Sequence, residues 1–173
     1  MTAFQWLLEL ILRRTRGRGH QTPTEEIDDL DLPARSAVEP REQPALSLGV
    51  GFLPVEGRIS SPFGMRKHPI SGAMKLHAGV DIAATRGSPV VATSNGRVSV
   101  ARELRGYGLT VVIDHAGDVQ TLYAHMDAIL VSAGEVVEER QVIGVVGATG
   151  NVTGPHLHFE VRRNGVPQDP ITT

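Results

Sequence analysis

The 173-residue chain contains no cysteine, and this absence excludes several kinds of functional site at once. Without thiolates there is no disulfide framework, no cysteine-ligated zinc finger, no iron–sulfur cluster and no cysteine nucleophile. A metal ion bound by this protein must therefore be held by imidazole and carboxylate groups.

Aromatic residues and excess charge are also scarce. Phe, Trp and Tyr make up 4% of the sequence, so few side chains are available on which the bases of a single-stranded nucleic acid could stack. The net charge of −2 gives no general attraction to phosphate backbones. We therefore expect no nucleic-acid partner, and a chain of this length suffices for one domain with its own core.

The N-terminus lacks the features of a membrane span or an ordinary secretory signal. Its apolar run is interrupted by Glu9 and falls well short of the ~20 residues that cross a bilayer. It also has no positive charge before the run and no small-residue cleavage site after it. Residues 1–14 instead predict an amphipathic helix, because apolar residues recur at helical spacing at Phe4, Leu7, Leu8, Ile11 and Leu12.

Three interpretations of this N-terminal segment stay open. The apolar face and the arginines that follow it suit contact with a membrane surface through residues 1–18. The segment equally suits a helix that binds a partner protein, or an imperfect start to the coding frame. Residues 15–47 predict a flexible, acidic, proline-containing linker, with a short helix over residues 24–32 as the alternative.

The third region, residues 48–173, predicts an all-β domain. Its apolar residues fall in short Val-rich runs, and turn sequences stand at residues 114–118 and 163–166. The absence of a sustained 3.6-residue period favours antiparallel strands in a barrel-like or sandwich arrangement. The expected strands are residues 89–92, 96–101, 109–114, 119–125, 142–146 and 156–162.

Histidines and acidic residues form two patterns in this domain. In a strand over residues 156–162, His156, His158 and Glu160 share one face, while Leu157 and Phe159 lie on the other. Two imidazoles on one strand face form a platform for a ligand, whereas the bland interpretation is a pair of solvent-exposed histidines.

The second pattern is His77 followed four residues later by Asp81. This spacing brings both side chains to one face in a strand or a helix, and Gly79 between them allows close approach. Alone the pair resembles a surface ion pair, but together with the His-x-His pattern it predicts a three-ligand metal site.

Such a donor set suits zinc in a catalytic role. Catalytic zinc typically has three protein ligands and a water, lowers the pKa of that water and polarises a carbonyl. His125 and one of the pair at 156 and 158 are candidates for proton transfer, and spacing alone leaves open which histidine binds and which catalyses. His68 and His115 are expected to be ordinary loop residues, with His68 a candidate for lining a substrate groove, and His20 to have no role in the site.

Residues 54–170 resemble the lysostaphin-like (LytM-type) zinc metallopeptidases, which cut peptide bonds in peptidoglycan. The resemblance rests on motifs in a fixed order: SPFGMRKHPI from Ser61, HAGVD from His77, GSPVVA from Gly87, YAH from Tyr123, VIGVVGATG from Val142 and GPHLHFE from Gly154. It implies a small antiparallel β-sandwich or split barrel of the duplicated hybrid motif type, with an open groove across one sheet.

The resemblance also implies a role for each site residue. His77, Asp81 and His158 would hold one zinc ion, and His125 and His156 would lie beside the water that attacks the substrate. Tyr123 would contribute a hydroxyl near the oxyanion. A peptidoglycan substrate implies a periplasmic, cell-envelope or extracellular location, or release by cell lysis as for a phage enzyme.

Two other classes of function compete with a wall-cutting peptidase. One is a non-catalytic peptidoglycan-binding module that activates another hydrolase, and bound metal discriminates the two, because such family members generally have an incomplete ligand set. The other is a carrier domain of the lipoyl type, suggested by the Val- and Gly-rich residues 142–150. That interpretation lacks a lysine at a hairpin tip and leaves the histidines unexplained.

Overall fold

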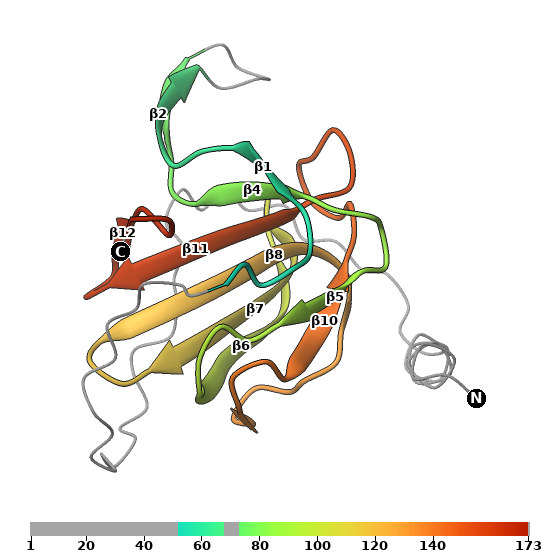
Figure 1. Ribbon diagram of the computed structural model, residues 1–173, viewed down its shortest axis with the longest axis vertical. Coiled ribbons are helices and arrows are strands. Elements are labelled where there is room, and N and C mark those ends of the chain that lie inside the picture. The colour runs from blue at the N-terminus through green and yellow to red at the C-terminus, as the bar shows by residue number, and fades with distance from the viewer. Residues whose placement is uncertain (1–51, 68–72, 173) are drawn as a thin grey trace. The chain divides into compact units, whose positions relative to one another are not determined.

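The computed structural model describes residues 52–67 and 73–172. The predicted N-terminal segment at 1–14, the linker at 15–47, His20 and His68 lie outside these ranges. The described residues form strands, turns and bends with no α-helix, which confirms the all-β prediction (Figure 1). Nothing in these ranges is a helix long and apolar enough to cross a membrane.

The described chain contains twelve strands. In chain order they are β1 (Arg58–Ser61), β2 (Gly64–Lys67), β3 (Met74–His77), β4 (Val80–Ala83), β5 (Pro89–Val91), β6 (Gly96–Leu104), β7 (Gly108–His115), β8 (Val119–Ile129), β9 (Val136–Val137), β10 (Val142–Val146), β11 (Leu157–Arg163) and β12 (Val166–Gln168).

The strands that the sequence predicted are all present, and their ends follow local turn chemistry. The hairpin between β11 and β12 turns at Asn164 and Gly165, whose φ angles of 52° and 79° match the two left-handed residues of a type I′ turn. Gly117 and Asp118 are also left-handed, with φ angles of 72° and 61°, in the three-residue turn between β7 and β8. The short strands β1 to β4, β9 and β12 were not predicted from the sequence. The strand predicted to end at His125 continues as β8 to Ile129.

One large antiparallel sheet carries most of the fold. Its strands follow the order β1-β4-β11-β8-β7-β6-β9, and the long strands lie side by side across Figure 1. β8 has two sets of partners: residues 119–124 pair with β11, whereas residues 126–129 pair with β10, which in turn pairs with β5. Because Met126 pairs with Leu109 of β7 on the opposite edge, β10 takes the place of β11 along one edge of β8, with β5 beyond it.

Alternation along the strands builds the core. Val80 and Ile82 of β4 and Leu157 and Phe159 of β11 are each at most 1% exposed and join one buried cluster with residues of β5 to β10. Because alternate residues point to opposite faces, the same strands turn Asp81 and His158 to the other face of the sheet. Burial of the apolar face therefore fixes the direction of the polar side chains.

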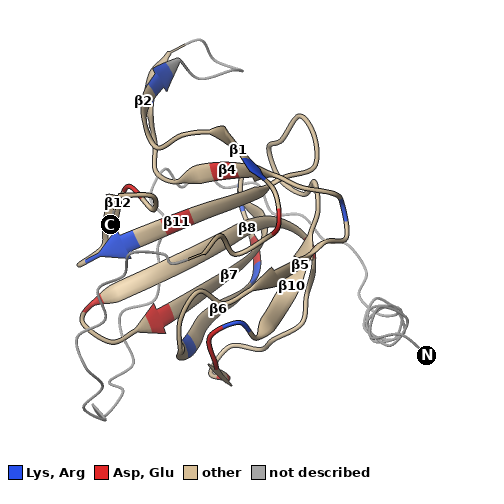
Figure 2. Cartoon of the chain, in the orientation of Figure 1, with Lys and Arg blue, Asp and Glu red and all other residues tan. Residues whose placement is uncertain are grey.

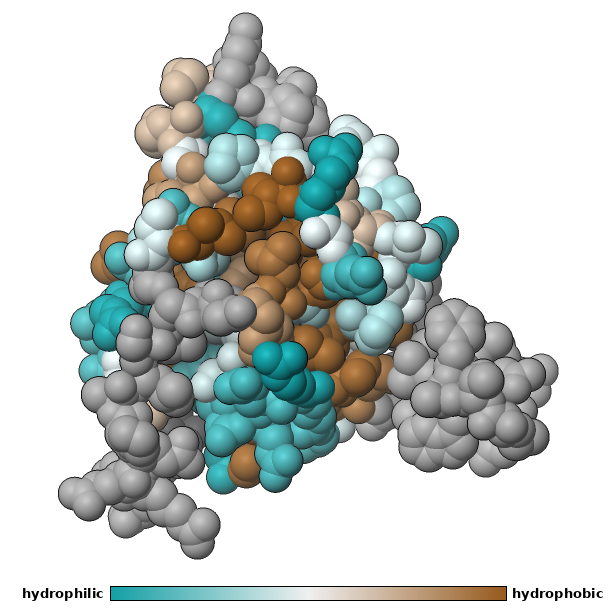
Figure 3. Space-filling view, viewed as in Figure 1, coloured by the Kyte–Doolittle hydropathy of each residue, from teal (hydrophilic) through white to brown (hydrophobic). Residues whose placement is uncertain are grey.

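A separate two-stranded sheet, β2 with β3, leads directly into this polar face. It keeps Met65, Met74 and Leu76 exposed, and His77 is the buried last residue of β3. In the orientation of Figure 3, apolar side chains gather in the middle of the visible face, with hydrophilic residues around them.

Candidate metal centre

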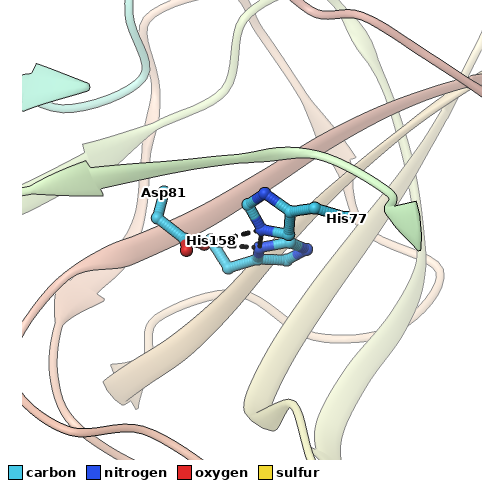
Figure 4. A group of neighbouring side chains, drawn as sticks. All are labelled: His77, Asp81 and His158. Atoms are coloured by element: carbon cyan, nitrogen blue, oxygen red, sulfur yellow. Dashed lines mark hydrogen bonds and ion pairs between the residues drawn. The ribbon is translucent and has the colours of Figure 1, made fainter. Parts of the chain in front are cut away.

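Three side chains from three strands converge on the polar face of the sheet. Asp81 of β4 and His158 of β11 are direct cross-strand partners, and His77 comes from the end of β3 (Figure 4). His77 Nε2 lies 3.1 Å from Asp81 Oδ1 and 3.2 Å from His158 Nδ1, and His158 Nδ1 lies 2.8 Å from Asp81 Oδ1. One atom from each residue therefore points to a common centre.

The convergence of His77 and Asp81 has a different cause from the one expected. Their spacing predicted that both lie on one face of a single element, but the chain leaves the β2–β3 sheet at residues 78–79 and enters the large sheet at Val80. Gly79 makes this passage possible, since a Cβ at that position would collide with the carbonyl oxygen of Phe159 and lie 2.8 Å from Glu160 Cγ.

The hydrogen bonds around the two histidines fit a metal ligand set. His77 Nδ1 donates to the carbonyl oxygen of Pro62 at 2.7 Å, and His158 Nε2 donates to the carboxylate of Glu160 at 2.9 Å. In the neutral form of each ring the proton is thus on the outer nitrogen, and the converging nitrogen is left to act as a ligand. Zinc bonds of about 2.0–2.1 Å in a tetrahedron would place the ligand atoms about 3.3–3.4 Å apart, close to the spacing found here.

The charges at the centre reinforce this arrangement. Burial alone would raise the pKa of Asp81, but hydrogen bonds with His158 and His77 outweigh it and hold the pKa well below its usual range. Burial would lower the pKa of His158, but its bonds to Asp81 and Glu160 and their negative charges raise it to about 9. The site is therefore electrostatically prepared for a cation.

His125 lies beside the three converging residues because the backbone of β8 is irregular there. Its φ is +63°, in the left-handed region, and it stands where β8 exchanges the partner β11 for β10. Its ring centroid is 4.8 Å from that of His156 and 5.8 Å from that of His158. Strict alternation would instead have placed it on the core side with Tyr123.

His125 is held as a neutral imidazole. Its Nδ1 donates to the carbonyl oxygen of Thr149 at 2.9 Å, which leaves Nε2 without a proton. Burial lowers the pKa of His125 to about 4, and the neighbouring His158 and His156 lower it further. These effects outweigh the hydrogen bond to Thr149, which by itself would raise the pKa.

His156 lies just before β11, in an isolated bridge to Gly147. Its Nδ1 donates to the carbonyl oxygen of Gly154 at 2.9 Å, and its Nε2 is 3.8 Å from Asp81 Oδ1. The structure therefore brings together all five of the metal-binding and catalytic candidates from the sequence. His115, predicted to be a loop residue, is the last residue of β7 and bonds to Asn95 and Thr121.

Tyr123 is placed differently from its expected position beside the oxyanion. Its side chain is 0% exposed, its ring packs on Phe159 in the core, and its hydroxyl bonds to Thr93 and Thr121. The reason is its register: Tyr123 pairs with Phe159, a core residue of β11, whereas its neighbour Ala124 pairs with His158. The expectation that its hydroxyl lies near the oxyanion is not met.

The tyrosine at the site is Tyr107, which the sequence analysis did not single out. Its ring centroid lies 5.7 Å from that of His158, its hydroxyl donates to Glu160 at 2.9 Å, and its carbonyl accepts from the His125 amide at 2.9 Å. The turn between β6 and β7 brings it there, and no local sequence signal reports such a long-range contact.

Two charged residues, Glu160 and Arg66, make contacts with the candidate ligands that the sequence did not predict. Glu160 was placed on the correct face, but its bond to His158 was not anticipated, and Arg66 of β2 lies 3.4 Å from Asp81 Oδ2. Figure 2 shows acidic positions on both β4 and β11, the adjacent strands that carry Asp81 and Glu160.

The described residues thus combine an antiparallel β fold with a candidate metal centre of the histidine–aspartate–histidine class, beside which two further histidines lie. Comparison with known proteins specifies the family. The model of Peptidase family M23 matches residues 75–170, which is more than half of the chain. The chain belongs to Peptidase family M23.

Individual relatives agree with this assignment. The DD-carboxypeptidase/endopeptidase Mpg of Neisseria meningitidis is 50% identical over 115 residues, which cover 66% of this chain and 26% of the relative. A zinc containing peptidase from Vibrio cholerae is similar in structure, with a TM-score of 0.66, 42% identity and coverage of 70% of this chain and 39% of that one.

The lysostaphin-like fold expected from the sequence is confirmed in the same way. The catalytic domain of the antimicrobial peptidase lysostaphin from Staphylococcus simulans aligns with a TM-score of 0.60 and 32% identity over 66% of this chain and 90% of that one.

The chain spans about a quarter of the length of the curated relatives it matches, as the 26% coverage of the Neisseria relative illustrates.

Proposed function

We propose that the domain is a zinc-dependent endopeptidase that hydrolyses peptide bonds in peptidoglycan stem peptides or cross-bridges. The observation that carries this proposal is the convergence of His77, Asp81 and His158, whose candidate ligand atoms lie 2.8–3.2 Å apart. The outer nitrogen of each of the two histidines is already hydrogen-bonded. Relatives named as DD-carboxypeptidase/endopeptidase and as zinc containing peptidase support the reaction and the metal.

His77 Nε2, Asp81 Oδ1 and His158 Nδ1 would hold one zinc ion in this proposal. When bound, zinc supplies a Lewis acid that polarises the scissile carbonyl and acidifies water. No protein sulfur is needed for such a centre, which agrees with a cysteine-free chain.

His125 and His156 would handle the protons of the reaction. The Nδ1–H of each ring donates a hydrogen bond to a backbone carbonyl, so a neutral ring has an unprotonated Nε2. The attacking water forms a bond to the carbonyl carbon and loses one proton to an imidazole, which then donates it to the nitrogen of the breaking C–N bond. The products are a carboxylate and an amine.

Paired variants test this division of labour. His158→Ala removes a ligand, so both zinc binding and cleavage should be lost. His125→Asn should keep zinc and lose cleavage by about 100-fold or more, because asparagine tolerates the left-handed backbone but cannot exchange a proton. Zinc content by atomic absorption and release of muropeptides by mass spectrometry give the two readouts.

The opposite pattern would contradict the proposal. A His125→Asn protein that cleaves as fast as the wild type would remove this histidine from the reaction. A wild-type protein that binds peptidoglycan without zinc and without cleavage would favour the non-catalytic binding module.

Further proposals concern the location and the domain boundaries of the whole chain. Hydrolysis of peptidoglycan requires a location in the cell envelope or outside the cell. We also propose the boundaries predicted from the sequence, with the catalytic domain at residues 48–173, a linker at 15–47 and contact with a membrane surface through residues 1–18. Comparing the location of the full chain with that of a chain lacking residues 1–20 tests the last of these.

A further inference from the structure

Glu160 is the most deeply buried charged group next to the metal ligands. Its side chain is 0% exposed, and both carboxylate oxygens are used. Oε1 accepts from His158 Nε2 and from the Tyr107 hydroxyl, each at 2.9 Å. Oε2 accepts from two guanidinium nitrogens of Arg162, each at 2.7 Å.

These contacts follow from the geometry of one strand. His158, Glu160 and Arg162 are alternate residues of β11, so they lie in a row on the same face of the sheet. Arg162 is itself nearly buried, with 11% of its side chain exposed, and it holds Oε2 so that Oε1 remains directed at His158. Tyr107 links the row to the backbone of His125.

We propose that Glu160 is a positioning residue of the metal centre: its carboxylate orients the His158 ring and keeps the ring proton on Nε2, which leaves Nδ1 to bind zinc. The inference rests on the proposed function and adds a residue that does not touch the metal. A carboxylate behind a ligating histidine commonly fixes its tautomer, and losing it typically weakens metal binding by about 10–100-fold.

The positioning role of Glu160 follows from the presence of a second acceptor for the His158 ring proton. Asp81 Oδ1 lies 2.8 Å from His158 Nδ1 and could also accept a proton from that nitrogen. With no acceptor behind Nε2, the neutral ring would place its proton on Nδ1, at the position that the metal needs. Glu160 removes this alternative by accepting from the far side of the ring.

A purely structural ion pair between Glu160 and Arg162 is the competing explanation, and two variants separate it from a positioning role. Glu160→Gln keeps the shape but sets an amide against the guanidinium of Arg162. The double variant Glu160→Met with Arg162→Met removes both charges together, a change that often leaves stability unaltered or improved. Glu139→Gln is the matched control, because Glu139 is a half-exposed carboxylate paired with Arg140.

The experiment measures zinc affinity of the full chain by competition with a chromogenic chelator, together with unfolding in excess chelator. We expect zinc affinity to fall about 10–100-fold in Glu160→Gln and at least as far in the double variant, while Glu139→Gln binds as the wild type does. The visible absorption bands of the cobalt-substituted protein should also change in the first two variants, which altered stability alone would not cause.

Zinc affinity within about threefold of wild type in both Glu160→Gln and the double variant would overturn the positioning role and leave an ion pair. That failure is distinct from failure of the proposed function. In the first case the wild type still binds zinc and cleaves peptidoglycan, and in the second it does neither.

Discussion

At the scale of single residues, the site depends on where each histidine keeps its proton. Pro62, Glu160, Thr149 and Gly154 each accept from one ring, so that four imidazoles are oriented by four different acceptors. His158 differs from the others because it lies between two carboxylates, those of Asp81 and Glu160. In the proposed zinc site, a proton and the zinc ion would therefore compete for its Nδ1.

This competition predicts how zinc binding depends on pH. Because the pKa of His158 is raised to about 9, zinc must displace a proton at any lower pH. Zinc affinity should fall about tenfold for each pH unit below that value, or about 100-fold between pH 8 and pH 6. Chelator competition at a series of pH values measures the slope.

His125→Asn provides the control for this titration. The pKa of His125 is lowered to about 4, so its ring is neutral throughout the range and the slope should be unchanged. A zinc affinity that stays constant from pH 8 to pH 6 would contradict the assignment of His158 Nδ1 as a ligand.

At the scale of elements, the centre depends on how closely β4 approaches β11. Asp81 and His158 meet because these strands pair directly, and Gly79 is the point where the chain has no room for a side chain. A methyl group there would collide with the Phe159 carbonyl and separate the two strands.

Gly79→Ala should therefore weaken both the fold and the metal site. We expect the free energy of unfolding to fall by about 1–3 kcal/mol and zinc affinity to fall more than about tenfold. Gly154→Ala is the control, because a Cβ at Gly154 meets nothing within 4 Å, and its unfolding should change by less than about 0.5 kcal/mol. Chemical unfolding and chelator competition measure the two effects, and equal behaviour of the variants would refute the steric argument.

The elements also show what the sequence could and could not predict. Alternation along residues 156–162 correctly predicted that His158 and Glu160 lie on the opposite face of the strand from Phe159. Burial of the apolar face in the core determines the direction of the side chains on the other face. The same rule fails for His125, whose left-handed backbone arises where β8 changes partners, a feature of the assembled sheet.

The two tyrosines illustrate the same limit. Tyr123 stands two residues before His125 but belongs to the core, because register with Phe159 decides its face. Tyr107 reaches Glu160 across 53 positions of sequence, a contact set by the pairing of strands rather than by any local pattern. Resemblance to a family predicted the ligand set, but the residues that orient its histidines required the structure.

At the scale of the whole molecule, the core defines where the domain begins. Val55 is 3% exposed in the main cluster, and the carbonyl oxygen of Pro54 accepts from the Val91 amide at 2.8 Å. The guanidinium carbon of Arg140 lies over the Phe52 ring, 4.1 Å from the ring centroid. The residues just before β1 are therefore part of the fold.

Two truncations test this boundary. A chain of residues 48–173 should melt within a few degrees of the full protein and bind zinc equally. A chain of residues 58–173 lacks Pro54 and Val55, and it should lose about 2–3 kcal/mol of stability from apolar burial alone. Thermal unfolding in the presence of zinc compares them. The boundary would be wrong if the longer fragment were as unstable as the shorter one.

The central claim is that this cysteine-free fold is a zinc-dependent hydrolase of peptidoglycan peptides. Its most direct test is mass spectrometry of cross-linked peptidoglycan treated with the purified chain before chelation, after exhaustive chelation, and after zinc is restored. The account predicts new peptide ends in the first and third samples and none in the second. Full cleavage in the chelated sample would contradict it.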